Sequence, residues 1–153
     1  MVSISDEMIK EIADQLDSGM KCFYHLPTGE LISYPDELKM GGVIDDEIWG
    51  EDIEKVEENF HEYIPFTAME SHESFQVMED FIELIQEEKV RRKFEEIILR
   101  RKPFQQFKYL LHDYPDLRQQ WFASKSERYK EYVKEQIDDY NSRLGMNEEQ
   151  DAS

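Results

Sequence analysis

The sequence predicts an α+β protein in which a small antiparallel sheet of about three strands packs against five or more helices. The chain has 153 residues, which suits one domain, and its 39% apolar and 12% aromatic residues can fill a core. Strand-like runs with turn signals occur before residue 70, and helical spacing of apolar residues dominates after it. We therefore expect one α+β domain over residues 1–144 and a disordered acidic tail over residues 145–153.

The first elements are an N-terminal helix and a β-hairpin. Ser3 and Asp6 resemble a capping box, and Gly19 suits the left-handed residue that ends a helix. Between them lies an apolar stripe of Ile9, Ile12, Ala13 and Leu16. Residues 22–26 and 31–34 then flank the turn residues 27–30, in which proline and glycine favour a hairpin loop.

A second helix and a third strand follow a glycine-containing acidic loop over residues 35–50. The helix is indicated by helical spacing of Trp49, Ile53, Val56 and Phe60. Residues 63–67 have the composition of a strand. Pro65 lacks an N–H group, so we expect this strand at an edge of the sheet or at a bulge.

From about Ser71 to Leu144 the apolar residues have helical spacing. Three apolar stripes follow one another: Phe75, Met78, Phe81, Ile82 and Ile85; Val90, Phe94, Ile97 and Ile98; Phe104, Phe107, Leu110 and Leu111. Pro103 and Pro115 each suit the first turn of a helix. The last helix is long, with Trp121 and Phe122 on its apolar stripe. A capping-box pattern at residues 124–127 marks a candidate break, and Gly145 is expected to end the helix.

Charge is distributed unevenly along the chain. The formal net charge is −18, with 24 Asp and Glu against 4 Lys and Arg in residues 1–88. Residues 89–134 instead hold 13 basic and 6 acidic residues.

The N-terminus lacks a signal-peptide pattern and no apolar run reaches the length of a membrane helix, so we expect a soluble cytoplasmic protein. The single cysteine, Cys22, excludes an internal disulfide and is expected in the core.

Catalytic and metal-binding motifs are not found. The sequence has no GxGxxG, GxxxxGK[ST], HExxH or GxSxG pattern, and an EF-hand reading of residues 45–56 fails at its last position, Val56. Cys22 and His25 should face opposite sides of their strand. We expect no catalytic residue, cofactor or metal ligand. An enzyme is less favoured and stays open; its sign would be a concave site that groups Tyr24, His25 or His112 with a buried carboxylate.

The basic C-terminal region is the candidate surface for a partner or an anion. Its candidate residues are Arg91, Arg92, Arg100, Arg101, Lys102, Lys108, Arg118 and Arg128. Cations between aromatic residues can bind phosphate and stack bases, but they can equally offset the acidic half of the chain. We favour the second interpretation. It predicts that neutralising Arg100, Arg101 and Lys102 together lowers stability.

Part of the same region resembles a bacterial family of small proteins, uncharacterised protein family 0158. The resemblance is carried by Phe104, Phe107, Lys108, Leu110, Tyr114, Pro115, Leu117, Arg118, Trp121, Phe122 and Arg128, and more loosely by the order of the N-terminal elements. Tyr140 stands near the chain end, where family members often have a tryptophan. The resemblance implies a cytoplasmic bacterial protein of unestablished function, and it supplies no catalytic residues.

For function, the sequence favours a non-enzymatic interaction or regulatory protein that acts through charged surfaces. The alternatives are a nucleic-acid-associated protein, which would use residues 89–134 directly or mimic nucleic acid with its acidic half, and a small enzyme with a novel pocket. We expect a protein partner ahead of nucleic acid, and no membrane. Assembly of several copies of the chain stays open.

Overall fold

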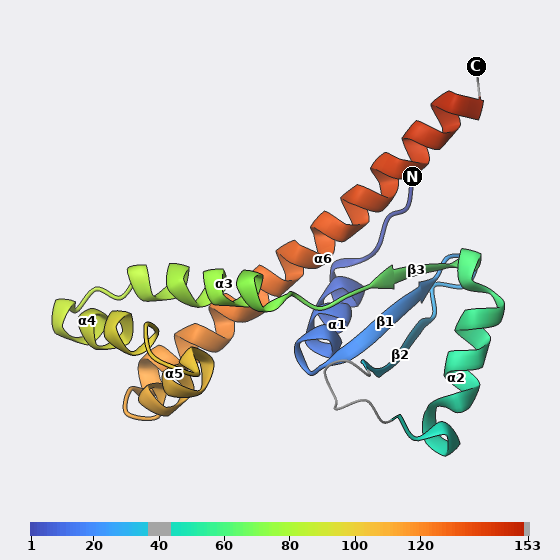
Figure 1. Cartoon of the computed structure of the whole chain (residues 1–153). Coiled ribbons are helices and arrows are strands. Elements are labelled where there is room, and N and C mark those ends of the chain that lie inside the picture. The colour runs from blue at the N-terminus through green and yellow to red at the C-terminus, as the bar shows by residue number, and fades with distance from the viewer. Residues whose placement is uncertain (37–43, 152–153) are drawn as a thin grey trace. The chain divides into compact units, whose positions relative to one another are not determined.

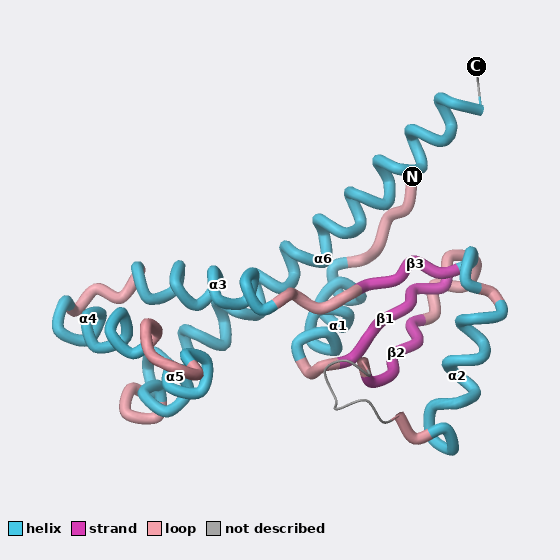
Figure 2. Tube along the Cα trace, viewed as in Figure 1, coloured by secondary structure: helices cyan, strands magenta, loops and turns pink. Residues whose placement is uncertain are grey.

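A computed structural model describes residues 1–36 and 44–151, with side chains up to residue 146. Within these residues six α-helices, one short 3-10 helix and a three-stranded antiparallel sheet are present, which confirms the predicted α+β class (Figures 1 and 2). The strands are β1 (Met20–His25), β2 (Leu31–Pro35) and β3 (Tyr63–Phe66). The helices are α1 (Asp6–Asp17), α2 (Asp46–Glu58), η1 (Phe60–Glu62), α3 (Ser71–Glu83), α4 (Glu88–Ile97), α5 (Pro103–Leu111) and α6 (Pro115–Asp151).

The chain forms two compact units. Unit 1 comprises Met1–Ala68 and Tyr129–Ser153, and unit 2 comprises Met69–Arg128. Helix α6 supplies residues to both. The single domain expected over residues 1–144 stays a prediction, and unfolding measurements with a probe in each unit test it.

Unit 1 is built around the sheet, whose strand order is β2-β1-β3. Phe23 in β1 lies opposite Ile32 on one side and Pro65 on the other. The predicted hairpin is confirmed, and Gly29 in its turn has a φ of 75°, which a residue with a side chain rarely adopts. Strand β3 lies at an edge of the sheet, as expected from Pro65. Proline has no N–H group, so at an edge it does not remove a hydrogen bond between central strands.

Helices α1 and α2 cover opposite faces of this sheet (Figure 1). On one face the Cys22 Sγ lies 3.9 Å from the Ile12 carbonyl oxygen of α1. On the other face lies a buried cluster of Phe23, Ile32, Tyr34, Val56 and Tyr63, against which Trp49 and Ile53 of α2 pack. Alternation along β1 thus separates Cys22 from His25, as predicted. Burial raises the pKa of the Cys22 thiol to about 11, so this thiol suits core packing and is a poor nucleophile near neutral pH.

Helix α1 confirms its predicted apolar stripe, because all four of its stripe residues are buried. The cap, however, is Ser5 and not Ser3. The Met8 N–H donates to the Ser5 hydroxyl at 3.2 Å, and Ser5 has the extended backbone of an N-cap residue. Gly19, with a φ of 94°, follows the helix end as expected.

Unit 2 has an aromatic centre formed by four rings from α3, α4, α5 and α6. The Phe107 ring lies 4.9 Å from that of Trp121, 5.5 Å from that of Phe94 and 6.3 Å from that of Phe81. All four side chains are buried. Pro103 and Pro115 open α5 and α6 as predicted. Two residues assigned to the core by spacing, Phe104 and Phe122, are exposed instead, and Phe60, assigned to the second helix, lies exposed in η1.

Helix α6 is continuous from Pro115 to Asp151, through both residues 124–127 and Gly145. Two amide side chains tie its later part to the rest of unit 1. Gln136 exchanges hydrogen bonds with both backbone groups of Thr67, at 3.1 and 3.2 Å, and Asn141 does the same with Val2, at 2.8 and 3.0 Å. No helix in the described part of the chain combines the length and apolar content needed to cross a membrane.

Truncation after Leu144 is expected to change the free energy of unfolding by less than about 1 kcal/mol, the scale of ordinary surface changes. Both side-chain ties of α6 lie before this point, and a Cβ built on Gly145 would meet nothing within 4 Å. Met146 is exposed. Chemical denaturation of the full chain and of the truncated chain measures the difference. A loss of several kcal/mol would show that the helix end packs on the protein.

Candidate functional site

Three of the eight candidate cations are paired with carboxylates. Arg92 lies 2.6 Å from the Glu88 carboxylate and Arg91 lies 3.4 Å from that of Glu95, both at the i, i+4 spacing along α4. Arg128 of α6 lies 2.8 Å from the Asp80 carboxylate of α3. The partners of Arg92 and Arg128 lie in the acidic residues 1–88, as the favoured interpretation expects, whereas Glu95, the partner of Arg91, lies in the basic region itself.

The Asp80–Arg128 pair connects two helices of unit 2. Asp80 accepts a hydrogen bond from the Arg128 guanidinium and another, at 2.7 Å, from the Gln76 side-chain amide. The bond from Arg128, followed by that from Gln76, lowers the pKa of the Asp80 carboxyl group below its usual value. Because both partners are about one-third exposed, the contribution to stability is that of a surface pair.

This pair predicts a pH dependence. A carboxyl group whose pKa is lowered in the folded state stabilises the fold above its unfolded pKa, and this contribution is lost as pH falls through the folded pKa. Arg128→Gln should therefore raise the pKa of Asp80 and remove the stability that this pair contributes above the unfolded pKa, which is less than about 1 kcal/mol. NMR titration of the Asp80 side-chain carboxyl carbon measures the shift. An unchanged titration midpoint would show that Arg128 does not hold this carboxylate.

Five candidate cations behave differently. Within the described residues, Arg100, Arg101, Lys102 and Lys108 make no ion pair, and all four are exposed. Arg118 lies over the ring of the exposed Phe122, 5.1 Å from its centre. The offsetting acids expected from the sequence are therefore not found beside Arg100, Arg101 and Lys102 in this part of the chain.

The three consecutive cations lie in the connection between α4 and α5. Leu99 precedes them, and its exposed fraction is 84%. Lys102 is the N-cap of α5 and has a φ of 54° in the left-handed region, which costs a residue with a side chain roughly 1–2 kcal/mol. We call the segment Leu99, Arg100, Arg101 and Lys102 the docking turn. Its backbone geometry was not predictable, because a glycine would have been the expected residue at position 102.

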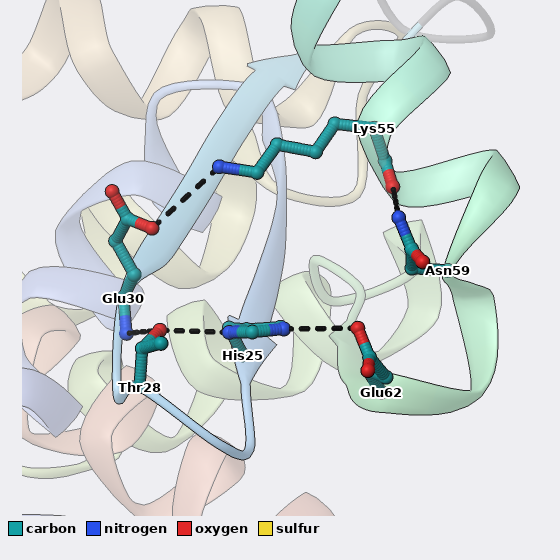
Figure 3. A network of polar contacts seen from close by, with 6 residues as sticks. All are labelled: His25, Thr28, Glu30, Lys55, Asn59 and Glu62. Carbon is teal, nitrogen blue, oxygen red and sulfur yellow. Dashed lines mark hydrogen bonds and ion pairs between the residues drawn. The ribbon is translucent and has the colours of Figure 1, made fainter.

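A polar network around His25 is the feature of unit 1 that bears on an enzymatic function (Figure 3). The His25 Nδ1 lies 2.7 Å from the Thr28 hydroxyl, and its Nε2 lies 3.2 Å from the Glu62 carboxylate. A hydroxyl, an imidazole and a carboxylate in this order have the arrangement of a nucleophile, a base and an orienting group. The sequence named His25 but not Thr28 or Glu62, which lies 37 positions away.

The contacts around this network favour a structural role. The Glu30 N–H donates to the Thr28 hydroxyl, and the Gly29 N–H donates to the His25 carbonyl oxygen. Amides that are already engaged cannot form an oxyanion hole beside Thr28. Glu62 is partly exposed, so the network is not the grouping with a buried carboxylate that would have marked an enzyme. It holds the hairpin turn against η1.

Among the residues that the structure describes, one group of possible metal ligands occurs, at the start of α3. Single ligand atoms of Glu70, His72 and Glu73 lie within 4.8 Å of one another. The Glu73 carboxylate accepts from the Glu70 N–H in a capping box, and Glu70 and His72 are exposed. The close spacing in the sequence was the signal for this group. Helix capping accounts for the Glu70–Glu73 contact, and the remaining contact, between His72 Nδ1 and the Glu70 carboxylate at 3.4 Å, joins two exposed side chains.

Comparison with known proteins agrees with the resemblance noted in the sequence. The sequence model of the uncharacterised protein family UPF0158 matches residues 7–153 of the chain. The chain belongs to this family. A family member from Pseudomonas aeruginosa, UPF0158 protein PA5073, is 31% identical over 67 residues, which is 44% of each chain. The match thus spans less than half the length of that relative. No solved structure matches the chain.

Proposed function

We propose that the chain is a non-enzymatic interaction protein of the cytoplasm, and that its docking turn binds a protein partner with an acidic, partly apolar surface. The observation that carries this proposal is the group of three adjacent cations that make no ion pair among the described residues. The chain has 36 acidic and 18 basic residues, so an exposed cation has many acids available. Three adjacent cations that pair with none of the described acids are available to a partner.

The exposed leucine favours a protein partner over nucleic acid. Leu99 offers an apolar side chain directly beside the cations, and protein interfaces combine apolar anchors with a charged rim. Nucleic acids are bound through phosphate contacts and aromatic stacking, to which leucine adds little. The net charge of −18 also opposes a long polyanion more than it opposes a short acidic patch.

The backbone at Lys102 supports the same interpretation. A left-handed residue is accommodated without strain by glycine, so a lysine at this position keeps a charge at a conformational cost. A strained backbone conformation persists only where the surrounding structure holds it, and such residues cluster at functional sites. The strain therefore favours a role for the Lys102 side chain outside the fold.

The test is tagged purification of the full chain from its native host, followed by mass spectrometry. We compare wild type with the triple variant Arg100→Gln, Arg101→Gln, Lys102→Gln. The control variant, Lys10→Gln, Lys134→Gln, Arg143→Gln, changes the net charge equally at exposed positions of unit 1. We expect proteins that co-purify with wild type and the control to be lost from the docking-turn variant.

Two further readouts separate the alternatives. The docking-turn variant should unfold at the same temperature as wild type, because no ion pair within the described chain is broken. A lower melting temperature would return these cations to a stabilising role. Salt-sensitive binding of single-stranded DNA by wild type, lost in the docking-turn variant but not in the control, would overturn the protein partner in favour of nucleic acid.

A further inference from the structure

Unit 2 contains a groove that no part of the described chain fills. Its volume is about 500 Å³, and an adjoining hollow of about 210 Å³ shares Leu84, Ile85 and Gln120 with it. The groove lies between the α3–α4 connection and the corner where α5 leads into α6. Its apolar lining is provided by Leu84, Ile85, Val90, Tyr114, Pro115 and Leu117. Leu84 is 76% exposed, so an apolar side chain remains in contact with water at this groove.

The charged residues that line this groove are all acidic. They are Glu87, Asp113 and Asp116, and none of them makes an ion pair within the described residues. The nearby Arg91 donates to the carbonyl of the lining residue Ile85 and is itself paired with Glu95. A partly enclosed groove whose lining is about equally polar and apolar, with three unpaired carboxylates, favours a ligand that offers an apolar side chain flanked by cations.

The docking turn has this chemistry, since the exposed Leu99 is followed by three cations. It cannot reach the groove of its own chain. The groove includes Glu87 and Val90 at the start of α4, whereas the docking turn follows the end of that helix. Ten helical residues rise about 15 Å, and the buried Val90 and Phe94 hold α4 in place. The turn that fits this groove therefore belongs to another molecule.

We propose that the groove binds the docking turn of a second copy of this chain, with Leu99 against the apolar part of its lining and the three cations against Glu87, Asp113 and Asp116. This inference rests on the docking-turn proposal and adds a partner to it. Four residues in one groove bury much less surface area than a stable protein–protein interface does. The association is therefore weak and depends on protein concentration. Binding of a second copy also competes with any other partner of the docking turn.

Sedimentation equilibrium of the purified full chain tests this inference. The experiment is done near physiological salt, where screening limits repulsion between two acidic molecules but leaves direct contacts effective. The weight-average mass of wild type should rise with protein concentration above that of one chain. The turn variant is Arg100→Glu, Arg101→Glu, Lys102→Glu, and the groove variant is Glu87→Lys, Asp113→Lys, Asp116→Lys. Each alone should stay at the mass of one chain.

Mixing the two variants provides the decisive arm. The reversed turn then meets the reversed groove, and the unaltered turn meets the unaltered groove, so the mixture should associate at least about tenfold more tightly than either variant alone. A control variant, Glu51→Lys, Glu54→Lys, Glu57→Lys, reverses three exposed acids of α2 and should associate no less than wild type. Circular dichroism confirms that each variant is folded.

Three results would overturn the inference: a wild-type chain that stays monomeric at the highest concentration, a groove variant that associates like wild type, or a mixture that does not associate. These results are distinguishable from failure of the proposed function. A monomeric wild type whose docking turn still captures another protein removes the second copy and leaves the docking turn. Self-association that the turn variant retains also contradicts this inference, whereas the proposed function fails only if the co-purifying proteins persist with the glutamine variant of the docking turn.

Discussion

Trp121→Ala is expected to lower the free energy of unfolding by about 3–5 kcal/mol, the usual cost of truncating a buried tryptophan. The Trp121 side chain is 8% exposed, and its ring lies 4.9 Å from that of Phe107 and 5.3 Å from that of Phe81. Removing it opens a cavity among three helices of unit 2. Chemical denaturation of wild type and variant measures the loss.

The adjacent residue supplies the control. Phe122 is 53% exposed, so Phe122→Ala should cost less than about 1 kcal/mol although it removes a similar ring from the same helix. In a Trp49→Phe background, Trp121 emission should be blue-shifted and protected from quenchers. Red-shifted emission with full quencher access would contradict the burial of this ring and favour a base-stacking role.

Phe23→Ala is expected to cost about as much, 3–5 kcal/mol, in unit 1. Phe23 is buried at the centre of β1 and stacks on Tyr34, with ring centres 5.1 Å apart and planes inclined by 22°. It belongs to the cluster that joins the sheet to α2. The control is Phe60→Ala, because Phe60 is exposed and its loss should be nearly neutral.

The two tryptophans also test whether the chain is one domain. Trp49 reports on unit 1 and Trp121 on unit 2, and each can be followed alone when the other is replaced by phenylalanine. One domain over residues 1–144 predicts that both probes give the same unfolding midpoint, and that Phe23→Ala lowers both. Two separate midpoints would show that the units unfold independently.

Local apolar patterns predicted the elements because each pattern reflects one buried face. The apolar stripe predicted α1, and Pro65 predicted the edge position of β3, without information from residues distant in the sequence. Spacing alone did not identify Phe122 as exposed, since it lies next to Trp121 but about 100° further around α6. Phe104 was also assigned to the core by its spacing along an apolar stripe. It is exposed, and its ring lies 6.3 Å from that of Phe75 at the surface of unit 2.

Local helix signals were overruled in α6. A capping pattern contributes about 1 kcal/mol, whereas the buried Tyr129, Val133 and Ile137 stabilise the helix just beyond it. Gly145 costs about 1 kcal/mol inside a helix, which is too little to end one that is already propagating. The helix therefore passes both positions.

The candidate surface was predictable in composition but not in pairing. The pairs of Arg91 and Arg92 follow from i, i+4 spacing on α4, whereas the Arg128–Asp80 pair joins residues 48 positions apart. Which cations lack a partner depends on how the helices pack. The groove was likewise not predictable, because its lining comes from two connections that are distant in sequence.

Photo-crosslinking from position 99 tests the central claim most directly. A photoreactive amino acid replaces Leu99 in the full chain, expressed in the native host, and the same substitution at Ile48, an exposed apolar residue of α2, is the control. The docking-turn proposal predicts crosslinked species that are formed from position 99 and not from position 48. They should be sensitive to protease, and they should disappear when Arg100, Arg101 and Lys102 are replaced by glutamine. Crosslinks that are sensitive to nuclease, or that persist in the glutamine variant, would contradict it.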